Sequence, residues 1–233
     1  MPNTDTQPMI IAEKKWLTED TLLIKLQPST HFDYHSGQYV LLGMTLETLK
    51  PFSIARAPTT SGRIELHIRD HDQSQWMQDL FALDVGETLY VQGPNDQYRL
   101  DAATELNAKD RVILVAGGTG FAPMFALLEN LLKLDTRHFN RPIEFYWGAQ
   151  TEAGLYRQTE MRSLAEKDDR LHFHTVISGD VSTADPQKLV HHQVLHDFPD
   201  LSRSRVYLCG PWAMQEAAKA DFISAGLPEA AFN

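Results

Sequence analysis

The sequence predicts two domains, a small antiparallel β-barrel followed by an α/β domain with a parallel sheet. Short β-rich segments separated by turn residues fill residues 8 to about 100, whereas strand and helix patterns alternate after residue 110. Between them lies Asp101–Asp110, a charged stretch with weak propensity for regular structure. We therefore assign residues 1–105 to the first domain and 106–233 to the second.

The first domain is predicted from short segments rich in Val, Ile, Leu and Tyr. Four of them are strand-like: Leu22–Leu26, Tyr39–Leu42, Ile64–Ile68 and Thr88–Val91. Glycines punctuate these segments, at Gly37, Gly62, Gly86 and the Gly93-Pro94 pair. One helix is expected from Ser74 to about Leu83, with Trp76, Met77, Leu80 and Phe81 facing inward.

The second domain is predicted from alternating strands and helices. Strands are expected at 112–116, 143–147, 172–177 and 205–209, and helices at 123–134, 155–166, 186–196 and 211–225. This alternation is typical of a parallel sheet covered by helices.

Composition limits what the protein can do. The chain has 233 residues, 42% of them hydrophobic and 22% charged, as in ordinary globular proteins. No apolar segment approaches the roughly 20 residues of a membrane span, and Met1–Thr6 does not resemble a signal peptide. We expect a soluble, cytoplasmic protein that does not associate with membranes.

Charge and cysteine content exclude further classes. A net charge of -10 argues against nucleic-acid binding and against attraction to an acidic protein partner. The single Cys209 excludes an internal disulfide and a cysteine-ligated iron–sulfur cluster. The pair His191-His192 is expected on a solvated loop or helix face. We expect no metal site, because we find no carboxylates or cysteine at ligand spacing.

A glycine-rich turn between the strand at 112–116 and the helix at 123–134 is the clearest functional signal. It contains Gly117, Gly118, Thr119, Gly120 and Pro123. A diphosphate placed there would meet unpaired N–H groups and the positive end of the helix dipole. Pro123 stands where the dinucleotide fingerprint has its third glycine. The turn alone therefore fits either a dinucleotide site or an ordinary connection.

Four motifs in order give a more specific indication. They are Ser36-Gly37-Gln38-Tyr39; Lys50-Pro51-Phe52-Ser53; Gly118-Thr119-Gly120 with Pro123; and Cys209-Gly210-Pro211 with Met214. With these motifs the chain resembles the ferredoxin–NADP⁺ reductase superfamily, although Lys50 replaces the usual arginine of the flavin motif. Leu66–Ile68, Tyr146–Gly148 and Leu155-Tyr156 are similar to segments of the small bacterial NAD(P)H:flavin oxidoreductases.

The resemblance implies a six-stranded flavin-binding barrel and a Rossmann-like NAD(P)H-binding domain. The implied activity is hydride transfer from NADH or NADPH to flavin N5, with FMN, riboflavin or FAD as a cofactor or a released substrate. One alternative is a reductase that retains FAD and passes electrons to a ferric chelate or an oxygenase. Reduced flavin could also serve a flavin-dependent monooxygenase. A binding module without turnover is a third interpretation.

The flavin residues implied by the resemblance lie in the barrel. They are Lys50, Pro51, Phe52, Ser53, His67, Ile68, Arg69 and Ser74. Ser53 is the candidate catalytic hydroxyl near N5, and Phe52 offers an aromatic face. Lys50 could meet phosphate only as a point charge. Structural roles are the alternatives: a serine bonded to backbone, a core phenylalanine and a barrel histidine at His67.

The residues implied for the nicotinamide nucleotide follow the strands of the second domain. They are Gly117, Gly118, Thr119, Gly120, Pro123, Trp147, Gly148, Gln150, Cys209, Gly210, Pro211 and Met214. Cys209, the second candidate catalytic residue, is expected to position the nicotinamide rather than to act as a nucleophile. Its alternative is a small buried hydrophobic residue.

Two local features predict ligand preference. Gln150 can serve a ribose hydroxyl, while Glu152 would repel a 2′-phosphate, so NADH is favoured. His71–Ser74 lacks the glycine of relatives that hold FAD, and Asp70 and Asp72 would repel phosphates, so a dissociable flavin is favoured. Relatives generally continue past the equivalent of Phe232-Asn233 into an aromatic-containing tail that covers the flavin. The absence of this tail either opens the isoalloxazine face or means that the sequence is shortened.

Overall fold

The computed structural model describes residues 6–179 and 189–233. Two compact units make up the chain. The first contains Met1–Leu100 and Phe125–Glu129, and the second contains Asp101–Met124 and Asn130–Asn233.

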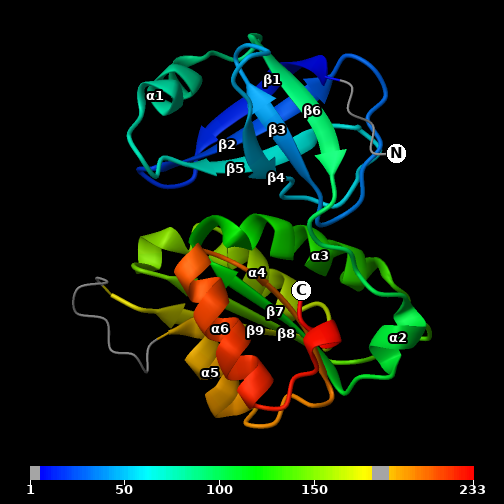
Figure 1. Cartoon of the computed structure of the whole chain (residues 1–233). Helices are drawn as coiled ribbons and strands as arrows, with labels where there is room; N and C mark the ends of the chain where they lie inside the picture. The colour runs from blue at the N-terminus through cyan, green and yellow to red at the C-terminus, as the bar shows by residue number, and fades with distance from the viewer. Residues whose placement is uncertain (1–5, 180–188) are drawn as a thin grey trace. The chain divides into compact units, whose positions relative to one another are not determined.

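The first unit is a six-stranded antiparallel barrel (Figure 1). Its strands are β1 (Thr6–Trp16), β2 (Thr21–Pro28), β3 (Tyr39–Gly43), β4 (Lys50–Ser53), β5 (Ile64–Arg69) and β6 (Thr88–Asn95), in the order β4-β3-β6-β1-β2-β5. The two edge strands meet where an Ile54–Leu66 bridge and a 2.8 Å hydrogen bond from Ala55 N–H to Glu65 O join them. The predicted barrel is confirmed.

Strands β1 and β4 were not among the predicted strands. β1 carries charged residues and does not alternate cleanly, because a register shift falls between Ile11 and Glu13. β4 is short and contains Pro51, which an edge strand tolerates because a ladder hydrogen bond is not required on its open side.

Helix α1 (Gln75–Ala82) covers part of the barrel core as predicted. Met77 and Leu80 are buried, while Trp76 and Phe81 are partly buried against the same core. This position places the N-terminus of α1 beside β4, the strand with the flavin motif.

The second unit is a four-stranded parallel sheet with helices (Figure 1). Its strands are β7 (Arg111–Gly117), β8 (Ile143–Ala149), β9 (Leu171–Ile177) and β10 (Ser204–Cys209), in the order β10-β7-β8-β9. The α-helices are α2 (Ala103–Asn107), α3 (Phe121–Lys133), α4 (Gln158–Ala165), α5 (Val190–Asp197) and α6 (Trp212–Ser224). Short 3-10 turns occur at Gly118–Gly120, Glu152–Gly154 and Glu229–Ala231.

The predicted α/β alternation is therefore confirmed, with two differences. α2 forms inside the stretch predicted to lack structure, and its buried Leu106 explains why. The helix expected at 186–196 is described from Val190 onward, and residues 186–188 lie outside the described ranges.

The register of the sheet gathers the predicted nucleotide residues at one edge. Gly117 pairs with Gly148, and Ala116 pairs with both Trp147 and Cys209. The carboxyl ends of β7, β8 and β10 thus meet, which is where open parallel sheets bind ligands. After Cys209 the chain turns into α6.

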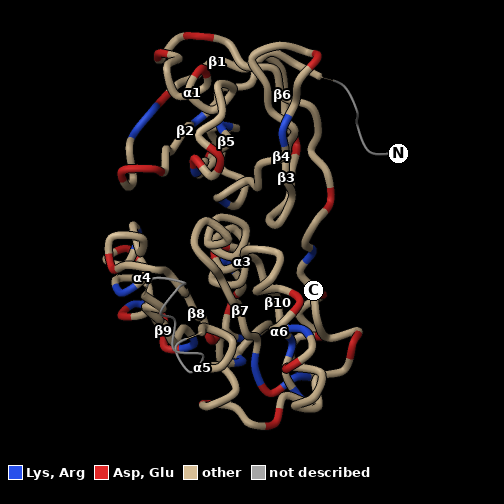
Figure 2. The backbone as a smooth tube through the Cα atoms, turned by 60° about the vertical axis from the view of Figure 1, so that its left-hand side comes forward, with Lys and Arg blue, Asp and Glu red and all other residues tan. Residues whose placement is uncertain are grey.

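The placement of charged residues and the length of the helices give two further observations. Acidic and basic positions are interspersed along the backbone of the described parts of both units (Figure 2). Among the described residues, every helix is too short or too polar to cross a bilayer.

Candidate functional site

The flavin motif on β4 forms a stacked platform with α1. The rings of Phe52 and Trp76 are 6.1 Å apart and 11° from parallel. Lys50 Nζ lies 4.5 Å from the centre of the Trp76 ring and 3.8 Å from Asp72 Oδ2. The structure therefore brings Lys50 and Phe52 together. It adds Trp76, which sequence reasoning assigned only to the core.

Ser53 points to the other face of β4 from Phe52, as strand alternation requires. Its hydroxyl makes a long hydrogen bond of 3.4 Å to Gln97 Oε1. Tyr39 pairs with Ser53 across β3 and β4, and the Ile54 N–H donates to Gln38 O at 3.0 Å. The hydroxyl of Ser53 is thus carried on a fixed backbone while its own bonding is weak.

The loop before β3 explains the glycine and glutamine that precede Tyr39. Gly37 has φ +92°, and a Cβ there would lie 2.5 Å from Tyr98 O. Gln38 accepts the His35 N–H and donates to Asp96 Oδ1, both at 2.8 Å. These residues hold the loop that leads into β3, the neighbour of β4.

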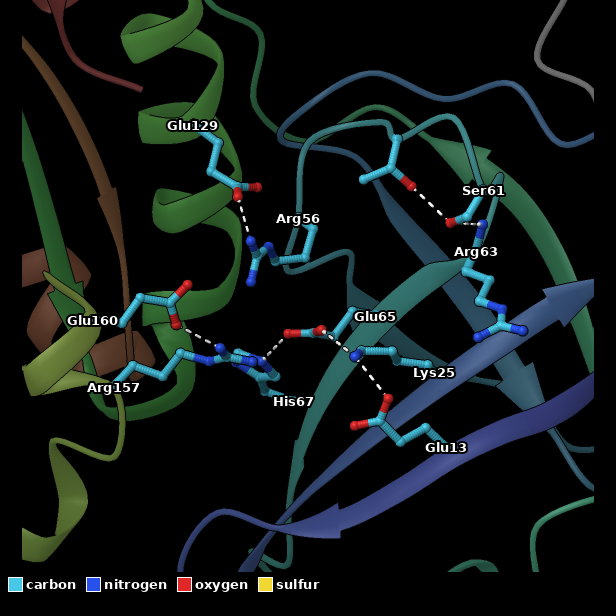
Figure 3. A network of polar contacts seen from close by, with 11 residues as sticks. Glu13, Lys25, Arg56, Ser61, Arg63, Glu65, His67, Glu129, Arg157 and Glu160 are labelled. Atoms are coloured by element: carbon cyan, nitrogen blue, oxygen red, sulfur yellow. Dashed lines mark hydrogen bonds and ion pairs between the residues drawn. The ribbon is translucent and has the colours of Figure 1, made fainter. Parts of the chain in front are cut away.

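The His67 side chain has a structural role. It has no exposed surface, and its Nε2 lies 2.9 Å from Glu65 Oε1. Glu65 Oε2 is 3.8 Å from Lys25 Nζ, which is 2.7 Å from Glu13 Oε2 (Figure 3). This network matches the barrel-histidine interpretation for the ring, so a flavin contact from His67 or Ile68 would use backbone groups.

Side chains already accept three backbone N–H groups at and just before the N-terminus of α1. Ser74 Oγ accepts the Met77 N–H at 3.4 Å, Asp72 Oδ1 accepts the Ser74 N–H at 3.1 Å, and Asp70 Oδ1 accepts the Gln73 N–H at 2.8 Å. The pKa of the Asp72 carboxyl is lowered, and hydrogen bonds from Ser74 are the main cause. This carboxylate is therefore ionised at neutral pH. A phosphate here would displace these bonds and meet negative charge.

Arg69 is also engaged within the barrel. Its Nε donates to Asp20 Oδ2 at 2.7 Å. Of the eight predicted flavin residues, Ser74 and Arg69 therefore have partners in their own unit that compete with a phosphate.

The glycine-rich turn after β7 has the opposite character. Gly118–Gly120 form a 3-10 turn and α3 follows at Phe121, with no side-chain cap on either helix. Gly118 has φ +54°, the left-handed region that favours glycine. The Phe121 N–H bonds to Gly118 O and Thr119 O, and Pro123 has no N–H. The backbone donors that this segment offers an anion are therefore those of the Gly118–Gly120 turn, which lies at the positive end of the α3 dipole and has no side-chain cap from the described residues.

Gly120 is required by packing against the backbone of the neighbouring turn, whereas Gly117 and Gly210 lie against the flexible Met214 side chain. A Cβ on Gly120 would lie 2.1 Å from the Cys209 carbonyl oxygen, and one on Gly117 would lie 2.5 Å from Met214 Sδ. A Cβ on Gly210 would lie 2.8 Å from the same sulfur. The turn after β7 thus packs directly against the turn after β10.

Trp147 was predicted to bind the nucleotide, but its side chain is fully buried. Its indole N–H donates to Gly118 O at 2.9 Å, and its ring stacks on Phe121 at 4.0 Å. Burial removes the ring from direct ligand contact. Trp147 instead fixes the orientation of the glycine-rich turn.

Other predicted nucleotide residues lie at the same sheet edge. Cys209 is half-buried at the end of β10, and Gln215 Nε2 donates to Gly210 O at 2.7 Å. Gln150 and Glu152 are exposed after β8. The Gly179 N–H donates to Gln150 O at 3.2 Å, which fixes the backbone while the side chain faces solvent.

One expectation about histidines is wrong. The sequence suggested a solvated face for His191-His192, but His191 is only 2% exposed. It lies on α5 against the hydrophobic core of the second unit, whose members include Val190 and Val194.

Comparison with known proteins agrees with this geometry. The model of an oxidoreductase FAD-binding domain matches residues 8–99, and that of an oxidoreductase NAD-binding domain matches residues 114–220. A CDP-6-deoxy-L-threo-D-glycero-4-hexulose-3-dehydrase reductase of Yersinia pestis is 34% identical over 97% of this chain and 67% of its own length. A probable flavin reductase of Vibrio harveyi is 32% identical, over 87% of this chain and 86% of its own.

A solved structure shares the fold. The Amycolatopsis cytochrome P450 reductase superposes with a TM-score of 0.86 at 24% identity, covering 98% of this chain and 68% of that one.

Proposed function

This chain belongs to the ferredoxin reductase family of FAD- and NAD-binding oxidoreductases, and from that membership we propose that it is an NAD(P)H:flavin oxidoreductase. It transfers hydride from reduced nicotinamide, preferably NADH, to a flavin that it binds reversibly and releases reduced. The observation that carries this proposal is a contrast between two helix starts. The Gly118–Gly120 turn before α3 has no side-chain cap from the described residues, whereas Asp70, Asp72 and Ser74 accept backbone N–H groups around the start of α1.

The α3 terminus fits a dinucleotide diphosphate. The Gly118–Gly120 turn that precedes it has no side-chain cap from the described residues, and Gly118 has a left-handed φ of +54°. Gly118 and Thr119 would bind the diphosphate through backbone N–H groups. Cys209 and Gly210, held against this turn, would position the nicotinamide ring.

The barrel fits a flavin ring better than flavin phosphates. Phe52 and Trp76 offer aromatic surface, and Ser53 offers a hydroxyl with one weak bond. Lys50 is engaged by Asp72 and Trp76. We assign Ser53 a hydrogen bond to the reacting edge of the flavin, and Phe52 and Trp76 the support of its plane.

The ligands supply the redox chemistry when bound: the nicotinamide is the hydride donor and the flavin ring the acceptor. The protein contributes binding, alignment and exclusion of water. Ser53 would donate or accept a hydrogen bond at the edge of the flavin ring. Cys209 would limit the position of the nicotinamide ring.

The Yersinia pestis relative favours a second candidate, because it is named as the reductase of a dehydrase. Under that function the chain would keep FAD and deliver electrons to a protein partner, such as an oxygenase, or to a ferric chelate. The carboxylates at the start of α1 favour the first candidate, since FAD retention relies on binding its phosphates.

Two measurements separate these functions. The absorption spectrum of the purified protein should show less than stoichiometric flavin, and NADH oxidation should require added flavin. A stoichiometric flavin spectrum with NADH oxidation supported by a ferric chelate alone would favour the electron-transfer function. No NADH oxidation under either condition would reject both.

A further inference from the structure

Three metal-ligating side chains meet on the outer helices of the second unit. His191 and His192 are on α5 and Asp221 is on α6. Their potential ligand atoms all lie within 4.8 Å of one another. Asp221 Oδ2 is 3.3 Å from His191 Nε2 and 3.4 Å from His192 Nε2.

These distances suit shared coordination better than two hydrogen bonds. A charged hydrogen bond between nitrogen and oxygen is about 2.7–2.9 Å, and both contacts are longer. Metal–ligand bonds of about 2.0–2.1 Å in a tetrahedron separate neighbouring ligand atoms by about 3.3 Å. One carboxylate oxygen thus stands at that separation from two imidazole nitrogens.

The fold holds the cluster in place. Val190 and Val194 of α5 pack in the same core as Ala218 and Phe222 of α6. The rings of His191 and His192 are 4.2 Å apart. Because both helices are fixed by buried neighbours on either side of the cluster, little rearrangement is needed to bring the three ligands together.

His191 is buried although it lies on an outer helix. Its side chain is 2% exposed, and its Nδ1 has no hydrogen-bond partner among the residues that the structure describes. Its Nε2 faces Asp221 Oδ2, so the ring of this buried side chain is already oriented toward the other two candidate ligands.

We propose that His191, His192 and Asp221 form a binding site for a divalent transition-metal ion of the Zn²⁺ class. Two imidazoles favour this class over Mg²⁺ or Ca²⁺, which prefer oxygen ligands. The side chains of His192 and Asp221 are 35% and 42% exposed, so solvent can reach the ion and complete a tetrahedron.

A metal bound there would join α5 to α6. The first residue of α5, Val190, packs against Gly148 at the end of β8, where a Cβ would lie 2.9 Å from Val190 Cβ. The metal would therefore stabilise the second unit near the nucleotide loops, without contributing to hydride transfer.

Zn²⁺ titration by calorimetry on the full-length protein, treated with a chelator and dialysed, tests the site. The variants are His192→Ala and Asp221→Asn, which alter exposed side chains. The matched control is His196→Ala on the same helix, since the His196 side chain is 82% exposed and pairs with Asp197. Unfolding temperatures without Zn²⁺ establish that each variant is folded.

We expect one Zn²⁺ per wild-type chain, binding at least tenfold weaker in both ligand variants and unchanged in His196→Ala. The wild-type unfolding temperature should rise with Zn²⁺, because a ligand of the folded state stabilises it. The proposal is overturned if wild type binds no stoichiometric Zn²⁺, if Asp221→Asn and His192→Ala bind as tightly as wild type, or if His196→Ala loses binding to the same extent. None of these readouts depends on flavin reduction.

Discussion

The N-termini of α1 and α3 are two helix ends of opposite character in one chain. The side chains of Asp70, Asp72 and Ser74 accept backbone N–H groups around the start of α1. Two of these three acceptors are carboxylates. The start of α3 follows Gly118–Gly120 and has no side-chain cap. The helix dipole favours an anion at the N-terminus of α1 and at the N-terminus of α3 alike. The neighbouring side chains therefore decide which of the two N-termini accepts a phosphate.

This difference is the basis of the two proposed roles, dinucleotide binding at the start of α3 and reversible flavin binding at the barrel. We propose that the segment before α3 binds the diphosphate of a nicotinamide dinucleotide and that the carboxylates around the start of α1 oppose a flavin phosphate. A flavin held mainly by its ring should exchange readily. The same comparison predicts where substitutions have large effects and where they have small ones.

Filling the α3 turn should have the largest effect. Gly120→Val places a side chain where even a Cβ would be 2.1 Å from the Cys209 carbonyl oxygen, so the turns after β7 and β10 must separate. We expect kcat/KM for NADH to fall by about a hundredfold or more, with lower stability, since overpacking costs about 1–3 kcal/mol or more.

Gly120→Ala should show a smaller loss in the same direction. Quenching of riboflavin fluorescence, which reports binding to the barrel, should persist in both variants. Wild-type NADH kinetics in Gly120→Val would show that the turn is not part of the nucleotide site.

Donor preference should respond to the exposed loop after β8. Gln150→Arg with Glu152→Gln supplies a guanidinium for a 2′-phosphate and removes an opposing carboxylate. We expect the NADPH to NADH ratio of kcat/KM to rise by about ten- to a hundredfold, because one charged hydrogen bond contributes about 1.5–3 kcal/mol. Glu152→Gln alone is the control and should give only part of the shift. An unchanged ratio would place the adenosine ribose elsewhere.

On the barrel side, Ser53→Ala should lower kcat by about tenfold while changing the flavin KM less, because the hydroxyl acts mainly in the transition state. Ser61→Ala is a matched control, since Ser61 lies in an exposed turn of the same unit and bonds Thr59. Steady-state kinetics with riboflavin would make the comparison. Equal kcat values for Ser53→Ala and wild type would remove Ser53 from the chemistry.

The smallest effect concerns the α1 end itself. Asp72→Asn should raise kcat/KM for FMN relative to riboflavin by about two- to fivefold, since interactions between exposed charges are weak. Asp79→Asn is the control, because Asp79 is an exposed carboxylate one turn further along the same helix, where it accepts a hydrogen bond from the Gln75 side chain. If FMN gains nothing over riboflavin in Asp72→Asn, repulsion at this helix end does not set flavin preference.

Much of the fold could be predicted because periodicity was strong. The buried strand Val112–Ala116 and the glycines after it were identified from sequence, as was α1, which was expected from Ser74 to about Leu83. β4 was recognised as a motif but not as a strand, because four residues including Pro51 carry little pattern. α2 was missed because one buried residue, Leu106, gives no periodicity.

The candidate site was harder to predict, because side-chain partners come from distant segments. Nothing local indicates that Trp147 bonds Gly118 O or that Gly120 meets the Cys209 carbonyl. The sequence pattern predicts a core position for Trp76, and its contact with Phe52 of β4 appears only in the folded structure. The cluster of His191, His192 and Asp221 escaped notice because its carboxylate is on another helix.

Flavin preference of the wild-type enzyme tests the contrast between the two helix ends most directly. The measurement is kcat/KM for riboflavin, FMN and FAD with saturating NADH at one ionic strength. If flavin phosphates gain nothing at α1, riboflavin should be used as well as FMN and FAD, within about threefold, since the exposed charges there interact weakly. A preference of about tenfold or more for FMN or FAD over riboflavin, equivalent to about 1.4 kcal/mol, would contradict the account.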